Sequence, residues 1–247
     1  MTKILDVKNI SKSYQTVLGE VLAIKDVSFS VSKGEIVGIV GSSGCGKSTL
    51  LNIIAGLDSA TGGKVLRDVS FAYMLQTDAL LPYLSVLDNA LLGLKIKKML
   101  TDENILYTKK LLESFGLGEF LDKYPANLSG GMRQRVALVR TLALKPDLIL
   151  LDEPLSALDY VTRLTITDQI WKILKELNVT TILISHDIAE CVSFCDRIIV
   201  LSKRPAVIKR EVEIPFANET IPSNKRKRND FNKYHDMIWG DLDKNIT

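Results

Sequence analysis

A run of glycine, serine and lysine residues between Gly41 and Thr49 has the composition of a phosphate-binding loop. It fits the pattern G-x-x-x-x-G-K-[ST], and its members are Gly41, Ser42, Ser43, Gly44, Cys45, Gly46, Lys47, Ser48 and Thr49. The glycines let successive backbone amides point at an anion, and the N-terminus of a following helix adds partial positive charge. Lys47 can reach the terminal phosphates of a nucleoside triphosphate, and Ser48 can ligate Mg²⁺. The loop therefore predicts nucleotide binding, with hydrolysis as the expected chemistry.

The segments beside this loop favour that prediction over a simple glycine-rich turn. Ile36 to Val40 is a short, almost wholly apolar run, which is typical of a strand buried on both faces of a parallel sheet. A helix is expected from Lys47 to about Ala55, where Gly56 ends it. A strand, a loop and a helix in this order are the context that the pattern requires.

A second apolar run, Leu148 to Leu151, is followed directly by the carboxylates Asp152 and Glu153. Because the carboxyl ends of parallel strands meet at one edge of a sheet, both acids are expected beside the phosphate-binding loop. Asp152 can hold the water shell of Mg²⁺, and Glu153 can take a proton from an attacking water. Capping of the next helix is the alternative role for Glu153, and it is weakened by Pro154, which follows directly.

A third segment places two glycines at the start of an expected helix, and it consists of Leu128, Ser129, Gly130, Gly131, Met132, Arg133 and Gln134. Ser-Gly-Gly before a helix is another anion-binding N-terminus, and alone it is a weak signal. Together with the two motifs above, it resembles the signature loop of the ATP-binding cassette (ABC) ATPases, which reads LSGG followed by a polar stretch that contains glutamine. The resemblance covers the chain to about Phe216.

The resemblance implies roles for four further elements, which follow the family's order along the chain. They are Tyr14 as the aromatic ring that stacks on adenine, Gln76 as the loop glutamine that senses Mg²⁺ and the partner, residues 156–159 as the loop that faces the dimer, and His186 as the histidine that holds the γ-phosphate and the attacking water. Ser48, Gln76 and Asp152 are thereby expected at Mg²⁺. Glu153, His186 and Gln76 are expected to act in catalysis.

Members of this family work in pairs, so the resemblance also implies a second copy of the chain as a partner. Two copies would face head to tail, with ATP held between residues 41–49 of one copy and residues 129–131 of the other. ATP and Mg²⁺ are the implied cofactors. Closure of the pair on ATP would pass a motion to another protein.

Within the family, the chain resembles the ATPase subunits of bacterial importers for nitrate, sulfonate, taurine and related nutrients such as thiamine or pyrimidine precursors. The matching stretches are residues 80–83, 131–135, 186–188 with Glu190, and 202–205. Two departures are a short span between Gly62 and Gln76, and Tyr83 at a position that is often tryptophan. The resemblance implies a separate membrane permease, indirectly an extracellular substrate-binding protein, and a location at the cytoplasmic face of the cell membrane.

Two other functional classes compete with the importer. A soluble ABC-type ATPase acting on nucleic acid or the ribosome is supported only by the basic run Lys225 to Arg228. A net charge of +3, from 32 lysines and arginines against 29 aspartates and glutamates, is too small to indicate such a partner, so no nucleic acid is expected. A regulator that holds ATP without hydrolysing it is disfavoured by Glu153.

The composition indicates a large core and a reducing environment. A chain of 247 residues that is 46% apolar can bury a sizeable core. The cysteines Cys45, Cys191 and Cys195 are odd in number and lack paired spacings, so no disulfide framework is predicted. Cys191 and Cys195 are interpreted as buried thiols on one helix face, without zinc. Neither a secretory signal nor a run of the about 20 apolar residues that span a bilayer is expected.

Short apolar strands alternate with helices after Ile36, which predicts an α/β fold with a P-loop NTPase core and a mostly parallel sheet. Antiparallel strands at Lys3 to Val7 and Val21 to Val31 predict an N-terminal β subdomain, and a helical signature subdomain is expected at about 80–145. Further strands are expected at 65–75, 148–151, 180–185 and 197–201, and further helices at 101–115, 132–144, 162–177 and 187–194. The ABC ATPase domain is expected over residues 1–222, with a basic tail and helix over 223–247.

Two surface features are also predicted. The stretch Leu80 to Leu94 is interpreted as a surface element with exposed leucines, where a short helix of a membrane subunit docks. A core helix is the open alternative for that stretch. The run Lys225 to Arg228 is interpreted as a solvated surface at the start of a terminal amphipathic helix.

Overall fold

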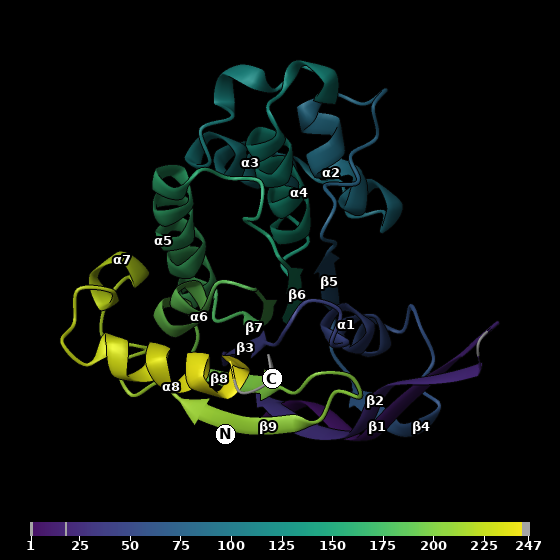
Figure 1. Ribbon diagram of the computed structural model, residues 1–247. Helices are drawn as coiled ribbons and strands as arrows, with labels where there is room; N and C mark the ends of the chain where they lie inside the picture. Colours follow the sequence, from purple (N-terminus) through teal and green to yellow (C-terminus); the bar gives the residue numbers. More distant parts are fainter. Residues whose placement is uncertain (1, 18, 244–247) are drawn as a thin grey trace.

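The computed structural model describes residues 2–17 and 19–243, which form two β-sheets and a set of helices (Figure 1). The strands are β1 (Lys3–Thr16), β2 (Gly19–Ser32), β3 (Ile36–Val40), β4 (Gly62–Arg67), β5 (Phe71–Met74), β6 (Leu148–Asp152), β7 (Thr180–Ile184), β8 (Arg197–Leu201) and β9 (Ile208–Glu213). The helices are α1 (Lys47–Ala55), α2 (Val86–Ile96), α3 (Asp102–Ser114), α4 (Gly130–Leu142), α5 (Tyr160–Glu176), α6 (Ile188–Phe194), α7 (Pro222–Lys225) and α8 (Phe231–Asp243), with single 3₁₀ turns at η1 (Gly118–Phe120) and η2 (Pro125–Asn127).

The larger sheet has the strand order β5-β6-β7-β3-β8-β9. Its strands pair in parallel except at one edge, where β9 runs antiparallel to β8. Strands β3, β6 and β7 are buried at every residue, as expected of central strands covered on both faces. The strands predicted at 36–40, 148–151, 180–185 and 197–201 are confirmed to within one residue. Strand β9 was not predicted, because its alternating charged residues resemble a surface loop.

The smaller sheet is antiparallel, with the order β2-β1-β4, and confirms the predicted N-terminal β subdomain. The single strand predicted at 65–75 is wrong. The chain leaves this sheet after Arg67 and enters the larger sheet at Phe71, where β5 pairs with β6. The crossing is held at Ser70, whose backbone amide and hydroxyl both donate to the Asp147 carboxylate. The polar residues around Asp68 therefore lie where the chain passes from the smaller sheet to the larger one.

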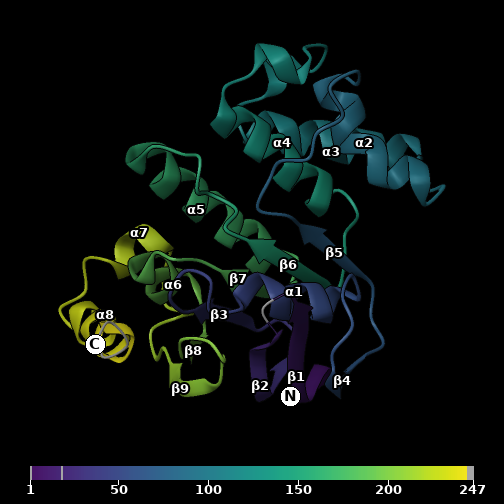
Figure 2. The ribbon, with the colours of Figure 1, turned by 45° about the vertical axis from the view of Figure 1, so that its right-hand side comes forward.

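Helices α2, α3 and α4 gather on one side of the molecule, where α4 packs against strand β5 at the edge of the larger sheet (Figure 2). Thr101 caps α3 and Ser129 caps α4, each by accepting a hydrogen bond from an amide of the first turn. Gly116, at a φ of 70°, ends the segment after α3, in agreement with the helix predicted at 101–115. In residues 2–17 and 19–243, no helix combines the length and the apolar character needed to cross a membrane.

The prediction of exposed leucines between Leu80 and Leu94 is wrong. Leu91 and Leu94 are buried, with Ala143 after α4 in the same apolar cluster, because α2 is amphipathic and turns its leucines toward that helix. Leu80 and Leu87 are partly buried against the main core. The exposed apolar side chains of this region are instead Tyr83, Ile96, Met99 and Leu100.

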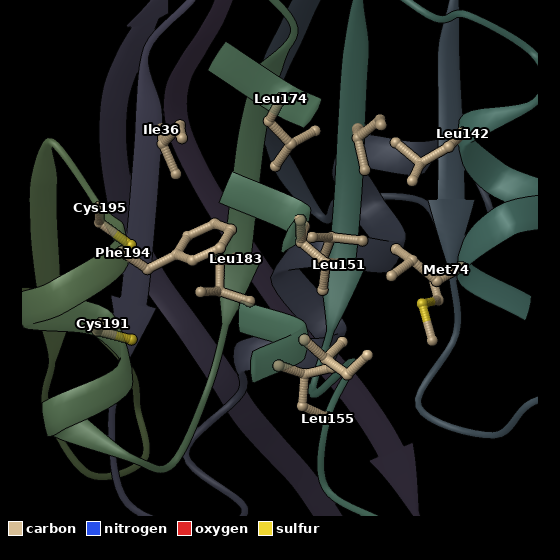
Figure 3. Close-up of a cluster of buried hydrophobic side chains, with 14 of the residues drawn as sticks. Ile36, Met74, Leu142, Leu151, Leu155, Leu174, Leu183, Cys191, Phe194 and Cys195 are labelled. Carbon is tan, nitrogen blue, oxygen red and sulfur yellow. The ribbon is translucent and has the colours of Figure 1, made fainter. Parts of the chain in front are cut away.

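The main core lies between the larger sheet and the helices that cover one of its faces (Figure 3). Leu151 and Leu183 project from β6 and β7 toward Phe194 and Leu174 of helices α6 and α5. Cys191 and Cys195 are buried free thiols on α6 and its end, as predicted. A second core on the opposite face packs α1 against the two sheets. Rigid packing on both faces holds the strand ends in place.

The C-terminal segment packs onto the same core. Phe231 and Ile238 of α8 are buried in the main cluster. The interpretation of Lys225 as part of a solvated run is wrong, because its side chain is fully buried and its ammonium group lies 4.3 Å from the centroid of the Trp171 ring on α5. Helix α7 is a short separate turn that folds back on α5, which the basic composition of this run could not indicate.

Candidate functional site

A cavity of about 520 Å³ opens at the carboxyl ends of the central strands, beside the N-terminus of α1. Its lining residues come from five separate parts of the chain and are Ser43, Gly44, Gly46, Lys47, Ser48, Thr49, Gln76, Glu153, His186 and Arg204. All of these except Arg204 were predicted as site residues from the sequence. The fold thus brings the phosphate-binding loop, one carboxylate and one imidazole to a single hollow.

The phosphate-binding loop between β3 and α1 uses glycines where the backbone turns to positive φ. Gly44 has a φ of 70° and Gly46 a φ of 126°, values that a residue with a side chain adopts at a cost. The Lys47 ammonium group is almost buried and donates to the carbonyls of Gly41 and Ser42 at 2.8 and 3.0 Å. These bonds curl the loop around its own lysine, and the lysine also lines the cavity.

Asp152 ends strand β6 and is only 3% exposed. Burial raises the pKa of its carboxyl, and the nearby Ser48 hydroxyl opposes that rise in pKa. Burial and the negative charge of Asp152 also raise the pKa of Tyr73. Oxygen Oδ1 of Asp152 is buried and has no hydrogen-bond partner among the described residues. A buried carboxylate oxygen without a partner is costly, and a bound cation would supply one.

Glu153 follows Asp152 with a φ of 50°, a left-handed conformation that is strained for a residue with a side chain. Its backbone amide donates to the Ile184 carbonyl at 2.9 Å, which anchors it to the end of the neighbouring strand. Its carboxylate lies 3.3 Å from the Gln76 side-chain nitrogen and 3.4 Å from Nδ1 of His186. The reversal in the backbone therefore turns this carboxylate toward the two other polar side chains of the cavity.

His186 lies in the turn between β7 and α6. The side chains of its two neighbours, Ser185 and Asp187, fix the conformation of this turn by hydrogen bonds. The Ser185 hydroxyl donates to the buried Glu190 carboxylate and accepts a bond from the Asp187 amide at 3.0 Å. Asp187 in turn caps α6 by accepting from the Glu190 amide at 3.0 Å. Burial raises the pKa of Glu190, and the hydrogen bond from Ser185 opposes that rise. The fixed turn presents an exposed imidazole to the cavity.

Several predicted site residues lie outside the cavity lining. Gly41, Ser42, Cys45 and Asp152 stand behind it: Gly41 and Ser42 hold Lys47, and Cys45 and Asp152 are buried. Tyr14 on β1 is 39% exposed, and its hydroxyl donates to Asp58 at 2.8 Å. The segment Ser129–Gly131 begins α4 and does not line the cavity of its own chain.

Arg204 lines the cavity and was missed as a site residue. Its guanidinium group donates to the Gly44 carbonyl at 2.8 Å, across 160 residues of sequence. The only sequence signal was its place in the stretch 202–205, which was interpreted as a mark of the importer subgroup. An arginine that touches the phosphate-binding loop adds positive charge where phosphates collect.

The parallel sheet, the glycine-rich loop before α1 and the acids at the strand end define a P-loop nucleoside triphosphatase. A family model described as ABC transporter matches residues 24–156. The nitrate transport protein NasD of Klebsiella oxytoca is 37% identical over 96% of this chain and 94% of its own length. The taurine import ATP-binding protein TauB of Jannaschia sp. is 37% identical over 98% of this chain and 96% of its own length.

Solved structures show the same relationship. The dimeric ATP-binding cassette MJ0796, in a post-hydrolysis state bound to ADP and Pi, matches 85% of this chain and 99% of its own, with 33% identity and a TM-score of 0.76. The chain belongs to the ABC transporter family and is an ATP-hydrolysing subunit. The predicted family and fold class are thereby confirmed.

Proposed function

We propose that this chain powers a bacterial importer, and that ATP-driven dimerisation drives uptake of a small nutrient of the nitrate, sulfonate, taurine or thiamine- or pyrimidine-precursor kind. The observation that carries the proposal is the meeting of the phosphate-binding loop, Glu153 and His186 in one cavity. The names of NasD and TauB, which refer to nitrate and taurine transport, support the nutrient class.

Phosphate binding follows from the loop before α1. The loop residues and the first residues of α1 line the cavity, and Lys47 would exchange its two carbonyl partners for phosphate oxygens. Arg204 would add a second cation at the rim. Tyr14 would stack on adenine through its exposed ring. Its hydroxyl already donates a hydrogen bond to Asp58.

Hydrolysis is assigned to the pair Glu153 and His186. A water between the Glu153 carboxylate and the γ-phosphate would give its proton to that carboxylate, which is a general-base step. His186, 3.4 Å from Glu153, would donate to the γ-phosphate and hold this water in line. Gln76 donates a hydrogen bond to the same carboxylate, so a change in the position of Glu153 on nucleotide binding would move the loop that follows Gln76.

The unpartnered Oδ1 of Asp152 and the Ser48 hydroxyl beside it fit Mg²⁺, which prefers oxygen ligands. We assign Ser48, Gln76 and Asp152 to hold it, directly or through water. When bound, the cation neutralises charge on the β- and γ-phosphates. The side-chain amide of Gln76 supplies another oxygen to this group of ligands at the rim of the cavity.

A second copy of the chain completes the site in this proposal. Ser129–Gly131 offers a helix N-terminus that its own cavity does not use. In a head-to-tail pair, this end would cover the nucleotide bound by the other copy. ATP then joins the two copies, and its hydrolysis releases them.

The motion would be passed to a separate membrane permease that receives substrate from an extracellular binding protein, with this chain at the cytoplasmic face. Leu75 and Tyr83 are exposed on either side of the loop that follows Gln76, and they offer an apolar contact there. That loop is also tied to α4, because Arg140 donates to the carbonyls of Asp78 and Ala79. A force applied at this loop therefore has a path to the signature helix.

Uptake by cells that lack the chain tests the proposal. Cells carrying wild-type protein or Glu153→Gln would be offered labelled nitrate, taurine and an alkanesulfonate in turn. Uptake of at least one compound by wild type alone, with an integral membrane protein co-purifying, supports the importer. ATPase activity that nucleic acid or ribosomes stimulate, without any membrane partner, would instead establish the competing class.

A further inference from the structure

Gln134 lies on α4, one turn beyond the signature residues, and is only 4% exposed. Its side-chain nitrogen donates to the Ser156 hydroxyl at 3.1 Å and to the Glu153 carbonyl at 3.4 Å. Its side-chain oxygen accepts the Ala157 amide at 3.1 Å. The backbone amide can only donate and the carbonyl can only accept, so the orientation of this side-chain amide is determined. One glutamine thus bridges the signature helix and the loop that begins at Glu153.

Glu153 needs such support because its backbone is held at a φ of 50°. Its carbonyl receives only long bonds, from Gln134 and from the Ser156 amide at 3.3 Å. Gln134 also accepts a hydrogen bond from the Ala157 amide, two residues before Asp159, which caps helix α5. A small displacement of α4 is therefore transmitted to the backbone that aims the Glu153 carboxylate.

The first turn of α4 is also in direct van der Waals contact with this loop. A Cβ added at Gly131 would come within 2.5 Å of the Leu158 side chain, whereas one added at Gly130 would meet Ala157 at an ordinary 3.8 Å. Arg133 on the same turn donates to the Asp78 carboxylate at 2.9 Å. Helix α4 consequently contacts two of the segments that border the cavity, the one that follows Gln76 and the one that begins at Glu153.

We propose that Gln134 is a positioning residue that fixes Glu153 for hydrolysis and couples it to the signature end of its own chain. Contact of Ser129–Gly131 with the nucleotide of the second copy then shifts α4 and, through Gln134, aligns Glu153 at the other site of the pair. This inference rests on the proposed roles of Glu153 and Ser129–Gly131.

Mixed dimers with a single working site test the positioning. Copy A carries Glu153→Gln and copy B is wild type at Glu153 and Ser129, with a different affinity tag on each copy so that only mixed dimers are collected; only the cavity of B then retains its carboxylate, and both signature ends stay intact. Gln134→Leu is then placed in A or in B. We expect a roughly 10- to 100-fold loss of kcat when it is in B, with the KM for ATP within about twofold, and less than a twofold change when it is in A.

Equal losses in both placements, or a loss confined to A, would overturn the positioning role, since a general folding defect affects both copies. Gln134→Glu keeps the bond from Ala157 but cannot donate to Glu153, so it should match Gln134→Leu in B. Thr141→Val is the matched control. That residue is equally buried on α4, and its hydroxyl donates only within the helix, to the Ala137 carbonyl.

The coupling has its own measurement in unmixed protein. The Hill coefficient of ATP hydrolysis should exceed 1 in wild type and fall toward 1 in Gln134→Glu. A wild-type coefficient of 1, or an unchanged coefficient in the variant, overturns the coupling. Failure of the underlying site assignment looks different: homodimers of A would stay active, or the mixed dimer without any Gln134 change would be inactive.

Discussion

Helix α1 follows Gly46 and helix α4 begins at Gly130, yet of these two helix N-termini only that of α1 lies in a cavity of its own chain. Helix α1 follows a loop with two glycines at positive φ and carries Lys47 in its first turn. Helix α4 is capped by the Ser129 hydroxyl, which accepts from the Met132 amide. Both ends offer partial positive charge. A complete phosphate site needs several converging groups, and the α4 end has none of the cavity's other groups beside it, which is why we propose that it meets the nucleotide of a second copy.

The glycines of the two helices also serve different purposes. At α1 they permit a backbone conformation that other residues avoid. At α4 they permit close packing, because the loop at Leu158 leaves no space for a Cβ on Gly131. Glycine thus allows the turns of a binding loop before α1, and it allows close packing of α4 against Leu158.

The largest effect is expected from Glu153→Gln, which removes the carboxylate that we propose as the base and leaves both helix ends intact. Hydrolysis should fall by about 10²- to 10⁴-fold while ATP binding persists. A stable ATP-bound dimer should accumulate, as measured by size-exclusion chromatography with light scattering. Turnover at the wild-type rate would remove Glu153 from the mechanism.

Lys47→Ala breaks the α1 end itself. Loss of charge-assisted bonds to the phosphates should weaken ATP binding roughly 100-fold or more, as measured by calorimetry. Ser129→Arg, at the α4 end, should leave the ATP affinity of the isolated chain within about twofold, because that end does not line the cavity of its own chain. Equal losses of affinity in the two variants would contradict the contrast between the helices.

Gly131→Ala tests the packing at α4. The new methyl group must displace the Leu158 side chain, so the free energy of unfolding should fall by about 1–3 kcal/mol in urea denaturation. Gly130→Ala is the control, and it should be neutral or stabilising, because its Cβ meets only an ordinary contact and alanine favours a helix. Identical destabilisation by both changes would exclude Leu158 as the cause.

Lys225 and Lys47 are both buried lysines, but only Lys47 lines the cavity, so Lys225→Met tests what burial of a lysine does to stability away from the site. Burial lowers the pKa of Lys225 from 10.5 to about 8, and its ammonium group has no hydrogen-bond partner within the described residues. The unfolded chain binds this proton more tightly, so the penalty is full below pH 8 and disappears as the pH rises toward 10.5.

The variant should therefore be more stable than wild type at pH 7, by roughly 1–3 kcal/mol, less the lost contact with Trp171. The difference should shrink at pH 9.5, as measured by urea unfolding at both pH values. ATP hydrolysis should be unchanged, because Lys225 lies on α7, outside the cavity lining. A stability difference that grows with pH would contradict the direction of the pKa change.

Most of the fold was predictable because local patterns carry it. Strands β3 and β6 are apolar at nearly every position, and each ends where a motif begins. Helix α3 lies within one residue of its predicted range, 101–115, at each end. The errors about burial share one cause, which is that burial of a segment depends on which distant part of the chain covers it. Leu80 to Leu94 and Lys225 were judged without knowledge of the helices that pack on them.

The sequence by itself determined the phosphate-binding loop from Gly41 to Thr49 and the acids Asp152 and Glu153, because glycine conformations and strand patterns depend on close neighbours. The tertiary structure alone decided which groups meet. It brought Arg204 to Gly44 and Gln134 to Glu153, and it left the signature end outside its own cavity. Such contacts join residues far apart in the chain, and local sequence preferences carry no record of them.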